Sequence, residues 1–286
     1  ERVGDEPIMI GHLDGRPLRI AEGVDATGIR LPDLGYARAA TESYEVFRRL
    51  RAEGVIAPGT RFQVALPTPT AVIGAFFSGD DRQAIEPVYR DLVYRELDGV
   101  LAAVPHDDLA IQWDCAVEFA VIETHAYPGG STPWWPGDVW QGLVDRAADA
   151  IDRVPLDVEV GVHLCYGDVG ERHFVEPRDA ANLTRFANEL TDATARPITW
   201  IHLPVPIERD DDAYFAPLEQ LAIGDAELYL GLVHREDGVD GARRRIETAA
   251  RHVEAFGAAT ECGIGRAPQD ATEDIFRTHV AVAAPA

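Results

Sequence analysis

Short apolar runs alternate with longer segments of helical periodicity along most of this chain. Six runs of six to eight residues combine Val, Ile, Leu and Trp with alternating small or polar residues, a pattern that predicts β-strands. They cover residues 61–66, 109–114, 158–165, 197–203, 227–233 and 257–262. Apolar residues three or four positions apart predict helices between these strands. The helices cover residues 82–104, 137–153, 177–193, 214–221 and 239–255, with a long loop over 115–136 and a last helix from about residue 270.

Strands that alternate with helices form βα units, and such units build a parallel sheet. Five successive strands of this chain end in a polar or reactive side chain. These residues are Asp114, His163 with Cys165, His202, His234 and Cys262. The active site of a TIM barrel lies at the carboxyl ends of its strands, whereas a doubly wound sheet gathers such residues only where its strand order reverses. The sequence therefore favours an α/β fold of the TIM (β/α)8 barrel type.

Six βα units are two short of the eight that a TIM barrel contains. Residues 1–36 are rich in Gly, Pro, Asp and Arg, and they predict loops with one short hairpin around residues 8–10 and 18–20. Residues 37–53 have helical periodicity and precede the first predicted strand. We therefore expect a loop-rich N-terminal segment and one barrel domain over residues 37–286, with the first barrel strands lying before this stretch of sequence.

The charge of the chain argues against some partners. Its 286 residues include 49 acidic and 26 basic ones, the latter all Arg, for a formal net charge of -23. Nucleic acids and anionic membranes bind positive protein surfaces, so neither is an expected partner. No apolar run approaches the roughly 20 residues that a membrane span requires. The three cysteines do not suggest a disulfide framework, and we expect a cytoplasmic protein.

One strand carries two residues that suit a metal ion. His163 and Cys165 are two positions apart in a predicted strand, so their side chains point to the same side of the sheet. Imidazole and thiolate groups bind zinc readily, and Cys262 supplies a third such group at the end of another strand. Zinc takes about four ligands, so the fourth would be water, a substrate thiol or His202. The alternative for His163 is a hydrogen-bonded histidine of the core.

A zinc ion with two cysteine ligands favours a particular chemistry. Such an ion is a poor activator of water, but it lowers the pKa of a bound thiol and so yields a nucleophilic thiolate at neutral pH. The pattern therefore indicates alkylation of a sulfur atom rather than hydrolysis.

Several other residues have two interpretations each. Asp114 either holds a substrate ammonium or hydroxyl group or caps the loop after its strand. His234 either acts as a general acid or base or caps its own strand. Trp134 and Trp135 lie in a loop rich in Pro and Gly, where they form either an apolar, substrate-binding lid over the site or ordinary loop packing. Cys115 points away from Asp114 and is predicted to lie in the core.

Five motifs of this chain follow one another in the order found in one known family. They are similar to that family's GP-containing loop (residues 67–77), QxDEP strand (112–114, QWD), HxCYS strand (163–167, HLCYG), IHS-type histidine (His234) and DCG strand end (261–263, ECG, followed by Arg266). Over residues 60–280 the chain therefore resembles the catalytic barrel of cobalamin-independent methionine synthase and its zinc-dependent alkyltransferase relatives.

The resemblance implies a TIM barrel with a zinc ion on His163 and the two cysteines named above. It also implies transfer of a methyl or alkyl group from an alkyl donor to a small-molecule thiol, with homocysteine among the acceptors to be considered. Asp114, with Gln112 beside it, would bind the amino end of the thiol substrate. His234 would serve as a proton donor.

The chain departs from that family at three points. His202 stands where the family has a Glu as fourth zinc ligand, and Cys115 and Ala116 follow Asp114 in place of Glu and Pro. The family's pterin-stacking Trp falls near Ala75, so we expect an alkyl donor other than folate. Three alternatives stay open: a sulfur-lyase that runs related chemistry in the cleavage direction, a metal-free decarboxylase of the related uroporphyrinogen type, and a zinc-stabilised binding protein without turnover. An open fourth coordination position would favour catalysis over the last of these.

Overall fold

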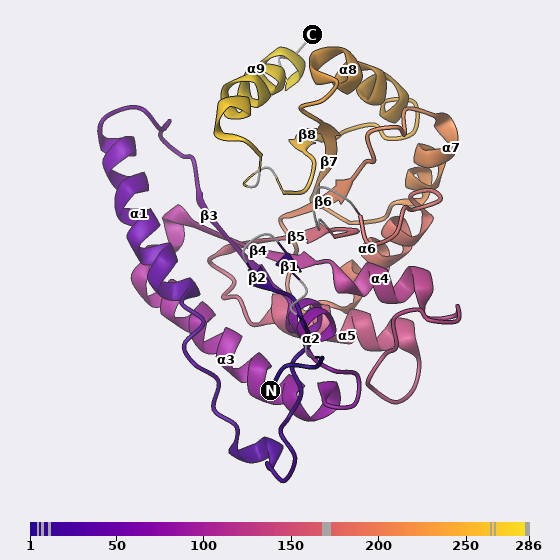
Figure 1. Ribbon diagram of the computed structural model, residues 1–286. Helices are drawn as coiled ribbons and strands as arrows, with labels where there is room; N and C mark the ends of the chain where they lie inside the picture. The colour runs from indigo at the N-terminus through magenta and orange to yellow at the C-terminus, as the bar shows by residue number, and fades with distance from the viewer. Residues whose placement is uncertain are drawn as a thin grey trace.

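A six-stranded parallel β-sheet organises the molecule (Figure 1). The structure is a computed structural model, which describes residues 1–4, 6, 9–10, 13–167, 173–263, 265 and 267–283. The strands are β3 (Phe62–Pro67), β4 (Leu109–Cys115), β5 (Glu159–Leu164), β6 (Trp200–Pro204), β7 (Glu227–Val233) and β8 (Gly257–Thr260). Each strand is hydrogen-bonded to the next one along the chain, in the order β3-β4-β5-β6-β7-β8. The predicted α/β class and the parallel sheet are confirmed.

Helices connect the strands and lie around the outside of the sheet (Figure 1). They are α1 (Tyr36–Ala52), α2 (Pro69–Phe76), α3 (Arg82–Ala103), α4 (Val117–Thr124), α5 (Val139–Asp152), α6 (Ala181–Ala193), α7 (Asp212–Phe215), α8 (Gly238–Ala249) and α9 (Thr272–Ala283). Short side chains cap three of them: Thr68 accepts the N–H of Ala71 at α2, Asp138 that of Gln141 at α5, and Asp211 that of Tyr214 at α7. Among the helices in the described part of the chain, none is long and apolar enough to cross a membrane.

Alternate residues of each strand face opposite sides of the sheet. One set is apolar and buried in the main core, and it includes Leu66, Ile111, Trp113, Val160, Val162, Leu164, Ile201, Leu203, Leu230 and Leu232. The other set is mostly polar or aromatic and lines a cavity, and it includes Gln112, Asp114, Glu159, His163, Trp200, His202 and Tyr229. The hydrophobic core therefore lies between the sheet and its helices, and the residues predicted to form the site lie on the opposite face.

The sheet is strongly curved. Two strands separate β5 from β8, and a flat sheet would hold this pair about 14 Å apart, because neighbouring strands are ~4.8 Å apart. Yet the Sγ atoms of Cys165, directly after β5, and Cys262, two residues after β8, lie only 3.2 Å apart. The cavity-lining face is therefore concave. In the described residues β3 and β8 are not hydrogen-bonded to each other, so the structure shows a curved parallel sheet with two edges.

The predicted long loop after β4 is wrong over residues 117–124, which form α4. This helix is short, and its residues Val117, Phe119, Val121 and Ile122 are buried together with Glu118. Apolar side chains on several sides leave no polar face, so the helical periodicity is absent from the sequence. Packing against α2 and α5 stabilises this segment as a helix.

The N-terminal segment contains a shorter hairpin than predicted. Two antiparallel strands of two residues each form it, β1 (Met9–Ile10) and β2 (Leu13–Asp14), so the predicted pairing with residues 18–20 is wrong. Ile8, which the prediction included, lies outside the described residues. Leu18 pairs instead with Arg2 and with the residue that follows α2.

Candidate metal centre and adjoining cavities

His163, Cys165 and Cys262 converge at the carboxyl ends of β5 and β8. One imidazole nitrogen and the two sulfur atoms all lie within 4.8 Å of one another. The two Sγ atoms are 3.2 Å apart, well beyond the ~2.05 Å of a disulfide bond. His163 is 6% exposed and Cys165 is 3% exposed. The structure thus brings together the three residues that the sequence predicts as zinc ligands.

Hydrogen bonds at the end of β5 set the position of Cys165. Its N–H donates to the Cys115 carbonyl at 2.8 Å, which continues the pairing with β4. The N–H of Gly167 then donates to Cys165 Sγ at 3.1 Å. Gly167 has a φ of 83°, and a Cβ atom there would lie 2.3 Å from the Phe174 ring. Only glycine therefore suits the turn that directs this N–H at the sulfur.

The surroundings of Cys165 hold its thiol in the neutral form. The hydrogen bond with Cys262 and then burial raise the pKa of the Cys165 thiol well above its usual value. Burial acts to lower the pKa of His163, but the Cys262 thiol and the Asp114 carboxylate outweigh it and raise that pKa. A Cys165 thiolate would therefore form here only beside a cation, which stabilises the negative sulfur atom.

His202 lies next to the cluster, directly across from His163 on the neighbouring strand. The two ring centroids are 4.4 Å apart, with an angle of 31° between the planes. Burial, and after it the adjacent His163, lower the pKa of His202 well below its usual value, so the ring is neutral. Within the described structure, His163 Nδ1 and His202 Nε2 have no hydrogen-bond partner. His202 is not among the three residues whose ligand atoms converge, and its role as fourth ligand stays a prediction.

Asp114 and Gln112 face the same cavity as the cluster. Gln112 Nε2 donates to Asp114 Oδ1 at 2.9 Å, and Trp200 Nε1 donates to Gln112 Oε1 at 3.1 Å. Burial raises the pKa of Asp114, although His163 and Gln112 oppose this effect. The Trp200 indole lies over Gly161 of β5, where a Cβ atom would be only 1.8 Å from the ring. These groups line a cavity of about 880 Å³ that includes the metal-ligand cluster.

Trp134 and Trp135 lie away from this cavity, in the layer of helices. Trp134 Nε1 donates to Glu86 of α3 at 2.8 Å, and the two indole rings meet edge to face at 4.9 Å. The guanidinium of Arg146 in α5 lies 4.2 Å from the Trp135 ring centre. Neither tryptophan is among the described residues that line either cavity near the cluster. Loop packing accounts for these contacts, and the structure does not bring this pair to the candidate site.

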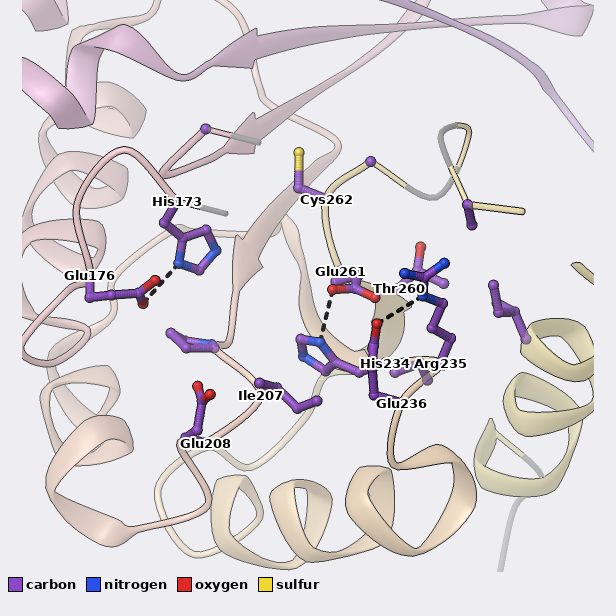
Figure 2. A pocket seen from close by; sticks show the side chains of 16 residues that line it. His173, Glu176, Ile207, Glu208, His234, Arg235, Glu236, Thr260, Glu261 and Cys262 are labelled. Carbon is purple, nitrogen blue, oxygen red and sulfur yellow. Dashed lines mark hydrogen bonds and ion pairs between the residues drawn. The ribbon is translucent and has the colours of Figure 1, made fainter. Parts of the chain in front are cut away.

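A second group of candidate ligands lies near Cys262, a member of the first group (Figure 2). His234 at the end of β7, Glu236 and Glu261 each place one ligand atom within 4.8 Å of the others. In Figure 2 the Glu261 carboxylate points toward the His234 ring, whereas the adjacent Cys262 thiol points away from it. This group lines a cavity of about 460 Å³, which shares Thr260 to Gly263 with the larger cavity. The two candidate sites are thus neighbours.

His234 is held at both ring nitrogens. Nδ1 lies 3.0 Å from Glu261 Oε2, and Nε2 lies 2.8 Å from the Val205 carbonyl oxygen. Sequence reasoning identified His234 alone and missed its two carboxylate neighbours. The signals were the HxE spacing of residues 234 and 236 and the position of Glu261 beside a predicted metal ligand. Arg266, which follows the ECG motif, lies outside the described residues.

Comparison with known proteins adds no assignment. A scan against models of protein families matches none, and a search of curated proteins finds no match to this chain. The chemistry of the site therefore rests on its own residues.

Proposed function

We propose that this protein is a zinc-dependent enzyme that transfers a methyl or other alkyl group to a small-molecule thiol. The observation that carries this proposal is the convergence of one imidazole and two thiols, from His163, Cys165 and Cys262, within 4.8 Å. This set of two sulfur ligands and one nitrogen ligand is characteristic of zinc.

The dimensions of the cluster fit the ion. Two sulfur ligands of tetrahedral zinc lie roughly 3.8 Å apart, given Zn–S bonds of about 2.3 Å. The observed sulfur separation of 3.2 Å would therefore have to increase by roughly 0.6 Å on binding. A buried His163 nitrogen without a hydrogen-bond partner among the described residues further supports a site that takes an additional group.

We also propose that the six strands belong to a TIM-type barrel. Two features support it: the strands pair in chain order without the reversal of a doubly wound sheet, and the sheet curves enough to join the ends of β5 and β8. Both candidate ligand groups lie at the carboxyl ends of strands, where the active sites of such barrels are found.

The residues of the chain have defined tasks in this proposal. Zinc, when bound, would lower the pKa of a substrate thiol that joins it and so make the sulfur nucleophilic at neutral pH. The carboxylate of Asp114, oriented by Gln112, would bind a cationic group of that substrate inside the larger cavity. The two cavities that meet at Cys262 offer separate access for the thiol and the alkyl donor. His234 as proton donor stays a prediction of the resemblance.

The decisive experiment is metal analysis by mass spectrometry on protein purified without added zinc. We expect about one zinc ion per chain, and its loss in Cys165→Ala and Cys262→Ala, because zinc needs about four ligands. Cys115→Ala is the matched control: Cys115 is a buried cysteine on β4, as Cys165 is beyond β5, but it is not in the cluster. Circular dichroism establishes that each variant is folded. A folded wild-type protein without metal would overturn the proposal in favour of the metal-free decarboxylase.

A second measurement separates catalysis from a purely structural zinc site. Addition of candidate thiols, homocysteine first, is followed by X-ray absorption at the zinc edge. Entry of a further sulfur ligand supports an open, catalytic coordination position. An unchanged spectrum in wild type, together with loss of a nitrogen ligand in His202→Ala, would indicate closed coordination by His202 and a binding protein without turnover.

A further inference from the structure

His234, Glu236 and Glu261 form a compact group of one nitrogen and two oxygen donors. They come from the ends of two adjacent strands, and their ligand atoms lie within 4.8 Å of one another (Figure 2). His234 is 5% exposed, whereas Glu236 is exposed and lies at the rim of the cavity. The group is thus buried at His234 and open on the side that faces the 460 Å³ cavity.

The hydrogen bonds of His234 direct one lone pair into this group. The Val205 carbonyl oxygen only accepts hydrogen bonds, so at 2.8 Å it holds the proton of the ring on Nε2. In the neutral ring, Nδ1 then carries a lone pair that faces Glu261 Oε2 at 3.0 Å. Two electron-pair donors at this distance require a proton or a metal ion between them. A carbonyl on the far nitrogen is also the usual arrangement behind a metal-binding histidine.

The surrounding charge favours a cation. The described residues that line this cavity include four glutamates, namely Glu176, Glu208, Glu236 and Glu261, and one arginine, Arg235. Arg235 Nε donates to Glu236 Oε1 at 2.8 Å, which leaves more negative than positive charge along the wall. A concave surface of one sign concentrates ions of the opposite sign.

We propose that His234, Glu236 and Glu261 bind a divalent cation that prefers nitrogen and oxygen ligands, with Mn²⁺ as the representative. This site is distinct from the thiolate cluster, which suits a softer ion such as zinc. Three protein ligands leave coordination positions open toward the cavity, where an anionic group of a substrate would bind. The inference does not depend on the proposed alkyl transfer, and it assigns His234 a ligand role in place of the proton-donor role.

The test uses Mn²⁺ alone as the probe, with the folded full chain, and follows the loss of the free-ion signal by electron paramagnetic resonance. We expect one Mn²⁺ per wild-type chain. Glu236→Gln and Glu261→Gln should weaken binding by about tenfold or more, on the scale of lost interactions at a metal site. Glu208→Gln is the matched control, because it removes the same charge from the same cavity without removing a ligand. Glu208→Gln should change the affinity for Mn²⁺ by about threefold or less, because it alters only the electrostatic potential of the cavity.

Two results would overturn the inference. One is the absence of Mn²⁺ binding to wild type at concentrations up to about 1 mM. The other is an equal loss of affinity in all three glutamate variants, which would show a diffuse electrostatic effect. The double variant Cys165→Ser/Cys262→Ser should lose zinc but keep Mn²⁺. Zinc content and Mn²⁺ binding therefore test the thiolate site and this site independently. If Glu261→Gln does not fold, the exposed Glu236 decides the outcome.

Discussion

Two buried cysteines at the ends of adjacent strands differ in the side of the sheet that they face, and this difference decides their roles. Cys115 at the end of β4 and Cys165 beyond β5 are both nearly inaccessible to solvent. Burial, followed by the nearby Glu118 and Asp114, raises the pKa of the Cys115 thiol well above its usual value, and this side chain lies on the helix side of the sheet. Cys165 lies on the concave side, next to Cys262. Cys165 is a candidate ligand because His163 and Cys262 lie next to it, not because it is buried.

Glu118 of α4 provides a prediction at the scale of a single residue. This carboxyl is 1% exposed, and Thr68 donates a hydrogen bond to its Oε1. Burial raises the pKa of Glu118 from its usual 4.5 to about 7, although the Thr68 bond opposes the change. The folded state therefore binds this proton more tightly than the unfolded state. Its contribution to stability is complete below pH 4.5 and is lost as pH rises toward 7 and above.

We expect Glu118→Gln to be more stable relative to wild type at pH 8 than at pH 5, by about 2 kcal/mol. The amide imitates the neutral carboxyl and does not ionise. Urea unfolding at the two pH values measures the difference. Glu42→Gln, which changes an exposed carboxylate of α1, is the control. A stability difference that is the same at both pH values would contradict the shifted pKa.

At the scale of elements, close packing of β6 on β5 requires a glycine. Gly161 pairs with Trp200, and the Trp200 indole occupies the space above it. A related arrangement recurs two strand pairs further, where the Tyr229 ring of β7 lies over Gly257 of β8. Strand glycines thus leave room for two aromatic rings on the concave face.

Gly161→Ala should destabilise the protein by roughly 1–3 kcal/mol, because the added Cβ would lie 1.8 Å from the indole. It should also displace Trp200 from Gln112, the partner of Asp114. Urea unfolding measures the first effect. Gly79→Ala, at a position where an added Cβ meets nothing within 4 Å, should change stability little. Equal stability of the two variants would show that the ring moves aside freely.

At the scale of the whole molecule, unbalanced charge acts against the folded state. The net charge is -23, and several ion pairs of the described residues join two exposed side chains. Exposed ion pairs contribute about 0–1 kcal/mol each and are weakened by salt. Repulsion among the excess carboxylates is also screened by salt, over a Debye length of about 10 Å at 0.1 M. Because the excess is large, we expect the loss of repulsion to dominate.

The melting temperature should therefore rise when NaCl is increased from about 0.05 to 0.5 M, a range over which the Debye length falls severalfold. Differential scanning calorimetry measures it. KCl should have the same effect, since screening depends on ionic strength and not on the ion. A fall in melting temperature with salt would mean that the surface ion pairs outweigh the net repulsion.

Much of the fold is predictable from local pattern, and part of the site is as well. All six strands of the sheet were expected close to their observed bounds, because alternation along a strand reports its burial directly. The same period of two predicts that the side chains of His163 and Cys165 face the same side of the sheet. Helix α4 was missed because its apolar residues leave no polar face, and the position of Trp134 in the helical layer is not visible in a loop sequence.

The sequence by itself therefore determined the βα repeat, the parallel sheet and the two candidate ligands that one strand presents to one side. These properties depend on residues a few positions apart, whose geometry the backbone dictates. Only the tertiary structure decided which distant groups meet. Cys262 reaches Cys165 from 97 residues away because the sheet curves, and Glu261 joins His234 because β7 and β8 are neighbours. Such contacts depend on the curvature and packing of the entire sheet, which no local pattern encodes.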